Sequence, residues 1–374
     1  MSRLTRLAAG PYAPPAPARE PTLVFADGAR PHAEAHGPND APPLLLAHGW
    51  VCSTAFWCDQ RGHGRSPTSP VCSPRAPADD PEAALAHTLA PGERAVIVGH
   101  SMGGMTVPTA TARPRFREHA PAILLCGTGS SRLVAEARVI PMRAGRGRTW
   151  LTARVLGSRT PLGPVTSMAR RILKYATTGA GYAPAMVEAC ARIVHACPCG
   201  ARHARSPVLK RLDLHDGVRE LAVPTAVIAG RADRPTAVIA GRADRLTPPV
   251  HARAIAAALP HRAGLTELPG LGHMPPVAAA PDLVTGRIRE LVTTCLRQTR
   301  NTTGAGSTTG AGSTTGAVET VGAVRTASAV QAVGAVDTTG AVEMPGAVDT
   351  TGAVETTGAV DGAGAEDTRA KEDA

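Results

Sequence analysis

Aromatic side chains are scarce in this chain of 374 residues, which has three Phe, three Trp and three Tyr, the last of them at Tyr182. From Asn301 to Ala374 the sequence also lacks Leu and Ile, and a Gly-Ala-Val unit recurs there at six-residue intervals. A segment with so few large apolar side chains cannot bury enough surface to form an ordinary core. We therefore expect residues 298–374 to be a low-complexity, disordered tail, and a short hexapeptide β-helix is the alternative interpretation.

Cysteine is present but lacks a metal-binding spacing. The eight cysteines include no CxxC pair, and the Cys197-Pro-Cys199 unit has no second pair at the distance typical of a zinc site. No stretch reaches the ~18 apolar residues of a membrane span, and the proline-rich residues 1–20 hold too short an apolar run for a secretory signal. These absences predict a cytoplasmic protein with no membrane span, no metal and no other cofactor. They also predict a disordered lead-in over residues 1–20.

Acidic residues are few in the body of the chain and frequent in the tail. Residues after 300 carry 10 acidic and 3 basic side chains, whereas the preceding residues carry 20 acidic and 37 basic ones. The basic residues are scattered among Ala and Pro without interleaved aromatic side chains, a pattern that does not favour a nucleic-acid partner. A small molecule is the expected partner, and the sequence leaves the oligomeric state open.

Short, uninterrupted apolar runs alternate with helix-compatible segments between residues 21 and 297. Such runs are typical of a mostly parallel central sheet, because a strand that is buried on both faces needs apolar residues at successive positions. The alternation of strands and helices indicates the α/β class. Two shorter strands, Thr22–Phe25 and His32–His36, are predicted to precede this sheet as a pair. The four buried runs are Pro43–Ala47, Ala95–Val98, Ala122–Leu125 and Thr225–Ala229.

Between Gly127 and about Leu214 the strand pattern stops. The segments in this interval have helical spacing and are separated by Gly and Pro, so we expect a helical cap over about residues 128–214, inserted into the α/β domain of residues 21–297. From Arg132 to Arg205 the sequence has thirteen basic residues and two acidic ones, which predicts a strongly positive cap.

A Gly-x-Ser-x-Gly motif, Gly99 to Gly103, follows one of the buried runs and precedes a helix-compatible stretch. This context indicates a nucleophile elbow, in which a sharp strand-to-helix turn exposes the hydroxyl of Ser101. Glycine is needed on either side because neighbouring backbone packs too closely for a Cβ. Ser101 is therefore the candidate nucleophile.

A serine hydroxyl needs a base to remove its proton and a carboxylate to orient that base. His273 is the candidate base, since it lies in a glycine-containing loop after a strand-like segment. The candidate carboxylate is ambiguous because the eleven residues Pro224–Arg234 are repeated without change as Pro235–Arg245. We favour Asp244, in the second copy, which continues directly into the helix before His273, and Asp233 of the first copy is the alternative.

Acyl transfer also requires two backbone N–H groups that face the developing negative charge. The elbow supplies one at Met102. The loop after the Pro43–Ala47 run supplies the other at Trp50, whose side chain is free to pack at the same time. Met102 and Trp50 are therefore the candidate oxyanion hole.

Taken in order, five segments of this sequence resemble the motifs of the α/β-hydrolase superfamily, and the likeness covers about residues 21–297. The resemblance implies a serine hydrolase of the capped, esterase-like branch, with Ser101 as nucleophile, His273 as base and Asp244 as the orienting acid. It also implies that the cap shapes the substrate pocket. A cofactor-free haloperoxidase or perhydrolase, which shares these motifs, is an alternative. The segments are His48–Trp50, Asp59–Ser66, Gly99–Gly104, Gly241–Pro248 and Gly272–Pro275.

Three features depart from that superfamily. The interval from Trp50 to Asp59 is too short for the helix and strand that the family has there, which predicts a gap in the sheet. Either copy of the duplicated segment can fill the same strand position, so the sequence allows two near-equivalent arrangements. Pro108 lies in the helix after Ser101, where proline removes a backbone hydrogen bond. A non-catalytic or misfolded α/β-hydrolase-like protein is therefore a further alternative.

Overall fold

The computed structural model describes ten stretches of the chain, all of which belong to one compact unit, Met1–Ala335. Asp233, the first copy of the duplication and the Asp59–Ser66 motif lie outside them. The described residues are 16–24, 28, 30–52, 76–179, 182–221, 236–241, 244–268, 270–274, 281–297 and 325–327.

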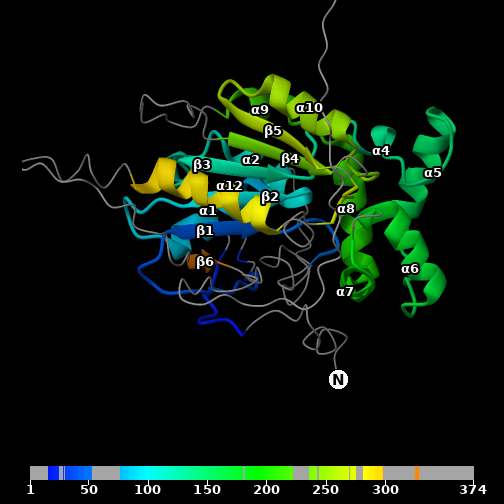
Figure 1. Cartoon of the computed structure of the whole chain (residues 1–374), viewed down its shortest axis with the longest axis horizontal. Coiled ribbons are helices and arrows are strands. Elements are labelled where there is room, and N and C mark those ends of the chain that lie inside the picture. The colour runs from blue at the N-terminus through cyan, green and yellow to red at the C-terminus, as the bar shows by residue number, and fades with distance from the viewer. Residues whose placement is uncertain are drawn as a thin grey trace, which may run out of the picture. The chain divides into compact units, whose positions relative to one another are not determined.

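A six-stranded parallel sheet forms the centre of the described chain, with strand order β5-β4-β3-β2-β1-β6 (Figure 1). This architecture confirms the predicted α/β class with a parallel central sheet, and the second copy of the duplication supplies β4. The strands are β1 Pro43–Ala47, β2 Val96–His100, β3 Ala122–Cys126, β4 Thr236–Gly241, β5 Arg262–Leu268 and β6 Arg325–Ala327.

The central strands are apolar throughout because both of their faces are buried. Successive residues point to opposite faces, so that Leu45 and Ile97 enter one core while Leu44 and Val96 enter the other. All five residues of β2 are buried. The uninterrupted apolar runs of the sequence are therefore the signature of a three-layer α/β/α arrangement.

The two faces are covered by different helices. One core includes side chains from α1, α2, α3, α9 and α10, and the other includes side chains from α7 and α12. No helix within the described ranges is long and apolar enough to cross a membrane. The bounds are α1 Ala76–Thr88, α2 Met102–Ala110, α3 Pro114–His119, α9 His215–Arg219, α10 Pro249–Ala258 and α12 Pro281–Val292, which continues into the π-helix η3 Thr293–Arg297.

The interval predicted to be a cap is helical. Helices α5, α6, α7 and α8 lie together beyond one end of the sheet (Figure 1). At the start of this interval helix is limited to the short α4, Leu133–Glu136. The remaining elements are α5 Arg146–Leu156, α6 Ser167–Leu173, the π-helix η2 Lys174–Thr178, α7 Pro184–Ala196 and α8 Cys199–Arg211.

β1 has a neighbouring strand on each side, so the predicted gap in the sheet is not found beside it. On one side β1 pairs with β2 over four residues, from Leu44 with Val96 to Ala47 with Gly99. On the other side it pairs with β6, so that three residues of the repetitive tail are a strand rather than disordered. The short interval after Trp50 was expected to leave one side of β1 without a neighbouring strand. β6 takes that place, so the tail forms the backbone hydrogen bonds with β1. The rest of residues 298–374 lies outside the described residues.

The helix that follows Ser101 continues through Pro108, in contrast to its expected weakness. Every residue of α2 except Thr109 is buried, so tertiary packing outweighs the loss of one backbone bond. Threonine hydroxyls also bond nearby carbonyls, as Thr106 does with Gly103 and Thr111 does with Pro108.

Within the described residues the predicted strand pair before the sheet is not seen, and Phe25, in its first strand, lies outside them. Thr22 to Val24 and His32 to Glu34 are irregular, and an isolated antiparallel bridge joins Ala35 to Arg19. Ala35 N–H donates to Arg19 O at 2.8 Å, and Ala18 N–H donates to Ala35 O at 2.9 Å. The segment 30–36 thus pairs with residues of the expected lead-in.

Candidate active site

Ser101 occupies a strained turn between β2 and α2. Its φ of 50° and ψ of −117° lie in a region that residues with a side chain rarely adopt. The surrounding glycines make this turn possible, because a Cβ on Gly103 would lie 2.0 Å from Ala47 O and one on Gly99 would lie 2.6 Å from the Gly104 Cα. This strain costs about 1–3 kcal/mol. It persists because β1 packs against the turn and excludes other backbone conformations.

A continuous hydrogen-bonded chain connects a hydroxyl, an imidazole and a carboxylate. His273 Nε2 lies 2.8 Å from Ser101 Oγ, and His273 Nδ1 lies 2.9 Å from Asp244 Oδ2. The three residues are 6%, 7% and 3% exposed, respectively. With Nδ1–H donating to the carboxylate, Nε2 is the acceptor that faces the serine hydroxyl. This arrangement is suited to removing the proton from Ser101.

Asp244 is held by four donors or potential donors. Its Oδ1 accepts the backbone N–H groups of Leu246 and Thr247, both at 2.8 Å. Its Oδ2 faces His273 Nδ1 and the Thr247 hydroxyl, which is 2.8 Å away. Thr247 Oγ1 is also within 2.8 Å of Gly127 O at the end of β3, so it ties the carboxylate loop to the neighbouring strand. The only signal of Thr247 in the sequence is its place three residues after the acid.

The His273 loop is fixed from the sheet side by His100. The His100 Nε2–H donates to His273 O at 2.7 Å. Burial, with a smaller contribution from His273, lowers the pKa of His100 to about 3, so its ring is neutral and keeps the N–H on Nε2. His100 therefore positions the backbone of His273.

The cap fixes the same loop from its other side. Gly272 N–H donates to Thr178 O at 2.7 Å, and Met274 N–H donates to Thr177 O at 2.9 Å, both acceptors being in η2. The Tyr182 hydroxyl donates to Met274 O at 2.7 Å. A Cβ on Gly272 would lie 2.6 Å from Thr178 O, which explains why this position is glycine.

The loop after β1 packs directly against the serine turn. A Cβ on Gly49 would lie 2.9 Å from the Ser101 Cβ, and Cys52 N–H closes a tight turn on Gly49 O at 3.2 Å. Val51 in this turn has a φ of 62°, which is strained for a β-branched residue. Met102 is the first residue of α2, and the first N–H groups of a helix have no partner within it. Trp50 and Met102 thus flank Ser101 on either side.

A cavity of about 290 Å³ opens above Ser101 and His273. Its wall is almost entirely apolar and comes mainly from the cap, so it offers space for a hydrophobic group beside the hydroxyl. Cys52 also lines it, but burial raises the pKa of that thiol and keeps it protonated, which leaves Ser101 as the activated nucleophile. The apolar lining includes Met105, Leu133, Val134, Val139, Ile140, Val155, Leu156, Leu162, Ile172 and Met274.

One buried cation of the cap also lines this cavity. Arg202 is 5% exposed and donates from Nε and Nη2 to Ser158 O and from Nη2 to Thr160 O. Its Nη1 has no hydrogen-bond partner among the described residues. By contrast, Arg170 and Arg192 on the cap surface both pair with Glu188, whose pKa they lower.

Comparison with known proteins agrees with this fold. A family model described as "Alpha/beta hydrolase family" matches residues 10–286. A search of curated proteins gave no match. Among solved structures, a thermophilic esterase from Thermogutta terrifontis has 22% identity and a TM-score of 0.56, covering 74% of this chain and 98% of its own. At this level of identity, the likeness concerns the fold.

Two further solved structures are similar to the same extent. A bromoperoxidase from Bacillus anthracis has 14% identity and a TM-score of 0.54, covering 74% of this chain and 100% of its own. An enol-lactonase from Burkholderia xenovorans LB400 has 20% identity and a TM-score of 0.53, covering 73% of this chain and 100% of its own. One fold therefore unites proteins with different reactions, and function has to be argued from the site.

Proposed function

Because the chain belongs to the alpha/beta hydrolase family, we propose that it is a serine hydrolase that cleaves a carboxylic ester or a related acyl bond. The observation that carries this proposal is the hydrogen-bonded chain from Ser101 Oγ through His273 to Asp244, with separations of 2.8 and 2.9 Å. A nucleophile, a base and an orienting carboxylate in this order are what acyl transfer requires.

In the first half of the reaction, Ser101 Oγ attacks the carbonyl carbon of the substrate while His273 Nε2 takes the hydroxyl proton. Asp244 keeps the proton of His273 on Nδ1 and stabilises the imidazolium that forms. The imidazolium then gives its Nε2 proton to the leaving alcohol, and the acyl group stays on Ser101. In the second half, a water molecule loses a proton to His273 Nε2 and attacks the acyl carbon. The imidazolium then returns this proton to Ser101 Oγ as the bond to the acyl carbon breaks, which releases the carboxylic acid and restores Ser101.

Both halves pass through a tetrahedral oxyanion. We assign its stabilisation to the backbone N–H groups of Trp50 and Met102, from the two turns that flank Ser101. A preorganised donor of this kind contributes on the order of 10²–10³ in rate, because it needs no reorganisation as the charge develops. The close packing of Gly49 on Ser101 supports the assignment of Trp50.

The apolar cavity of about 290 Å³ favours a medium-sized hydrophobic acyl group as substrate. Most of its wall comes from the cap, so cap side chains would set the preferred chain length. The positive charge of Arg202, one of the residues that line the cavity, favours an acidic group on the substrate.

A cofactor-free perhydrolase or haloperoxidase activity is the second candidate, since it would use the same three residues with hydrogen peroxide in place of water. The fold likeness to the Bacillus anthracis bromoperoxidase is the observation that favours it. Peroxide-dependent bromination, assayed beside ester hydrolysis, separates the two activities. The non-catalytic alternative depended on a gap in the sheet, and the pairing of β1 with β2 and β6 argues against it.

Labelling of the purified full-length protein with a fluorophosphonate probe tests the proposal. We expect labelling that is lost on heat denaturation and in Ser101→Ala. Ser130→Ala, which removes another buried serine hydroxyl, is the matched control and should label like the parent. A cooperatively melting protein that does not label would contradict the proposal. If labelling occurs, the hydrolysis rates of nitrophenyl esters of increasing acyl length show which acyl length the enzyme prefers.

A further inference from the structure

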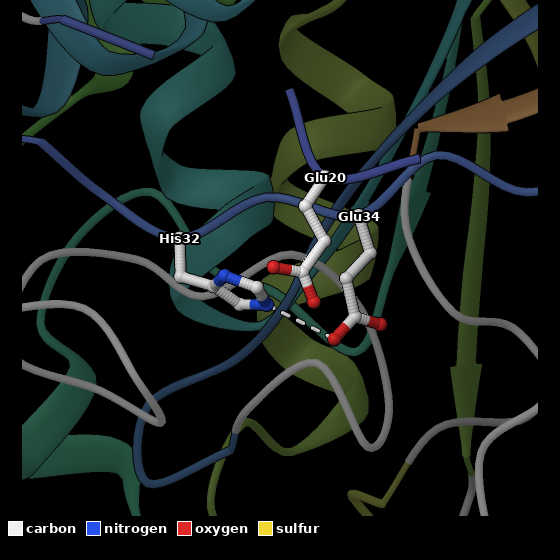
Figure 2. A group of neighbouring side chains, drawn as sticks. All are labelled: Glu20, His32 and Glu34. Carbon is white, nitrogen blue, oxygen red and sulfur yellow. Dashed lines mark hydrogen bonds and ion pairs between the residues drawn. The ribbon is translucent and has the colours of Figure 1, made fainter. Parts of the chain in front are cut away.

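Three side chains converge at the amino-terminal end of the described chain, outside the candidate active site. Figure 2 shows the carboxylates of Glu20 and Glu34 and the imidazole of His32 turned toward one another. One ligand atom from each lies within 4.8 Å of the other two, and His32 Nε2 is 3.0 Å from Glu34 Oε1. Glu34 is buried, His32 is half-buried and Glu20 is exposed, so the group faces solvent on one side only.

The local sequence explains why these groups meet. In the segment His32-Ala-Glu-Ala-His36, the side chains of His32 and His36 both contact Glu34, so alternate residues share one side. Ala33 and Ala35 are 4% and 8% exposed, while His32, Glu34 and His36 share the opposite side. The antiparallel bridge between Arg19 and Ala35 then brings the residue after Arg19 alongside Glu34. Glu20 therefore joins the group from a separate stretch of chain.

A fourth residue supports the buried carboxylate. His36 Nε2 is 3.3 Å from Glu34 Oε2, while His32 Nε2 is beside Glu34 Oε1. Each oxygen of the carboxylate thus has its own imidazole. His36 would hold Glu34 in orientation if Oε1 were bound to a cation, which is the arrangement that metal sites commonly show around their ligands.

We propose that Glu20, His32 and Glu34 form a binding site for a divalent transition-metal ion of the zinc type. The ligands would be His32 Nε2, Glu34 Oε1 and one Glu20 oxygen, with water completing the coordination. One imidazole and two carboxylates suit Zn²⁺, which binds such nitrogen and oxygen atoms at about 2.0–2.2 Å. Ligand atoms of a tetrahedral site are then about 3.3–3.5 Å apart, close to the 3.0 Å between His32 and Glu34. As a ligand, His32 would carry its proton on Nδ1 and offer the lone pair of Nε2 to the ion.

The place of the site in the fold indicates a structural ion. Glu20 also lines a cavity of about 250 Å³ with Pro43 and Leu44, at the amino end of β1. Ser101 follows the carboxyl end of β2, which is parallel to β1, so the two sites belong to opposite edges of the sheet. An ion at Glu20 would fasten the amino-terminal segment to the segment that leads into β1. The proposal therefore goes beyond the hydrolase function and does not depend on it.

Calorimetric titration of Zn²⁺ into chelator-treated, full-length protein tests the site. We expect one equivalent to bind, with an affinity that falls at least tenfold in Glu34→Gln and in His32→Gln. His261→Gln, which alters an exposed histidine just before β5, is the matched control and should bind like the parent. Equal binding by the parent and both site variants, or no stoichiometric binding at all, would overturn the proposal.

Two additions keep the test decisive. Glu20→Gln changes an exposed ligand and should lower the affinity at least tenfold without disturbing the buried Glu34, so it serves if Glu34→Gln does not fold. The spectrum of the Co²⁺-substituted protein should lack a thiolate-to-metal charge-transfer band, whereas such a band would assign the ion to cysteine and overturn the proposal. Because fluorophosphonate labelling of Ser101 should be unchanged by chelation, failure of this site is distinguishable from failure of the hydrolase.

Discussion

The carboxyl edge of the sheet and the helical cap enclose the same cavity but are built from different interactions. At the edge, Ser101, His273 and Asp244 are buried and joined by hydrogen bonds of 2.8–2.9 Å. The cap surface instead exposes large apolar side chains, among them Trp150 and Met168 at 64% and 61%. We infer that the edge fixes the reaction and that the cap, which supplies most of the apolar wall of the cavity, determines the acyl group.

The largest expected effect tests the edge through its carboxylate. Asp244→Asn keeps the shape of the side chain but allows the amide to favour the wrong tautomer of His273, so we expect kcat to fall by about 10⁴. Steady-state hydrolysis of a nitrophenyl ester measures this. Asp233→Asn alters the equivalent residue of the other copy and is the matched control, with unchanged activity expected. If Asp233→Asn were the damaging change, the acid would come from the first copy.

The next effect tests whether Thr247 positions Asp244. Thr247→Val removes the hydroxyl that lies 2.8 Å from both Asp244 Oδ2 and Gly127 O. A hydrogen bond to a charged group contributes ~1.5–3 kcal/mol, so we expect kcat to fall about tenfold to a hundredfold while KM changes little. Thr109→Val removes a hydroxyl within α2 and should leave kcat unaltered. A fall in melting temperature without a fall in kcat would instead assign Thr247 a purely structural role.

The sequence predicts the edge better than it predicts the periphery. Gly99 to Gly103 is informative because a strained serine turn requires glycine, and β1 to β3 are informative because strands buried on both faces require uninterrupted apolar residues. These constraints are local, so they are visible in short windows. Within the site, Thr247 and the positioning role of His100 were missed, because each acts through a contact with a distant strand or loop.

The outer parts of the fold depend on long-range pairing instead. β6 comes from the repetitive tail and pairs with β1 nearly 300 residues away in the sequence, and nothing in its composition indicates that it joins the central sheet. Likewise, His32–His36 has the alternation of a strand, but the described bridge in this segment joins Ala35 to Arg19, which lies in the expected lead-in. Such pairings depend on what the rest of the chain leaves uncovered, which a local pattern does not record.

A smaller effect concerns the stability of the edge at acidic pH. Burial lowers the pKa of His100 to about 3, whereas an unfolded histidine has a pKa of about 6.5. Between these values the unfolded state binds a proton that the folded state does not, so this stability is present above about pH 6.5 and is lost as the pH falls toward 3. The loss is at most about 1.4 kcal/mol per pH unit. His251, whose pKa burial also lowers, acts in the same direction.

Urea unfolding of the parent and of His100→Gln between pH 7 and pH 4.5 measures this contribution. Glutamine keeps an N–H donor for His273 O but cannot titrate, so the free energy of unfolding should decline less steeply with acid in the variant. The contribution of His251 is common to both proteins and cancels in the difference. If the free energy of unfolding fell equally steeply with acid in the parent and in His100→Gln, His100 would not be the group responsible.

The smallest expected effect tests the cap, and with it the other half of the comparison. Leu156 of α5 is half-buried and lines the cavity above Ser101, so Leu156→Trp should occupy part of the acyl space without touching the hydrogen bonds at the edge. We expect kcat/KM for long acyl chains to fall about tenfold relative to short ones, as one or two methylenes in an apolar pocket are worth ~1–3 kcal/mol. Met168→Trp, on the exposed surface of α6, is the control of equal size. An equal loss of kcat/KM for every acyl length would mean that α5 supports the reaction geometry itself. The inference that the edge fixes the reaction while the cap determines the acyl group would then be wrong.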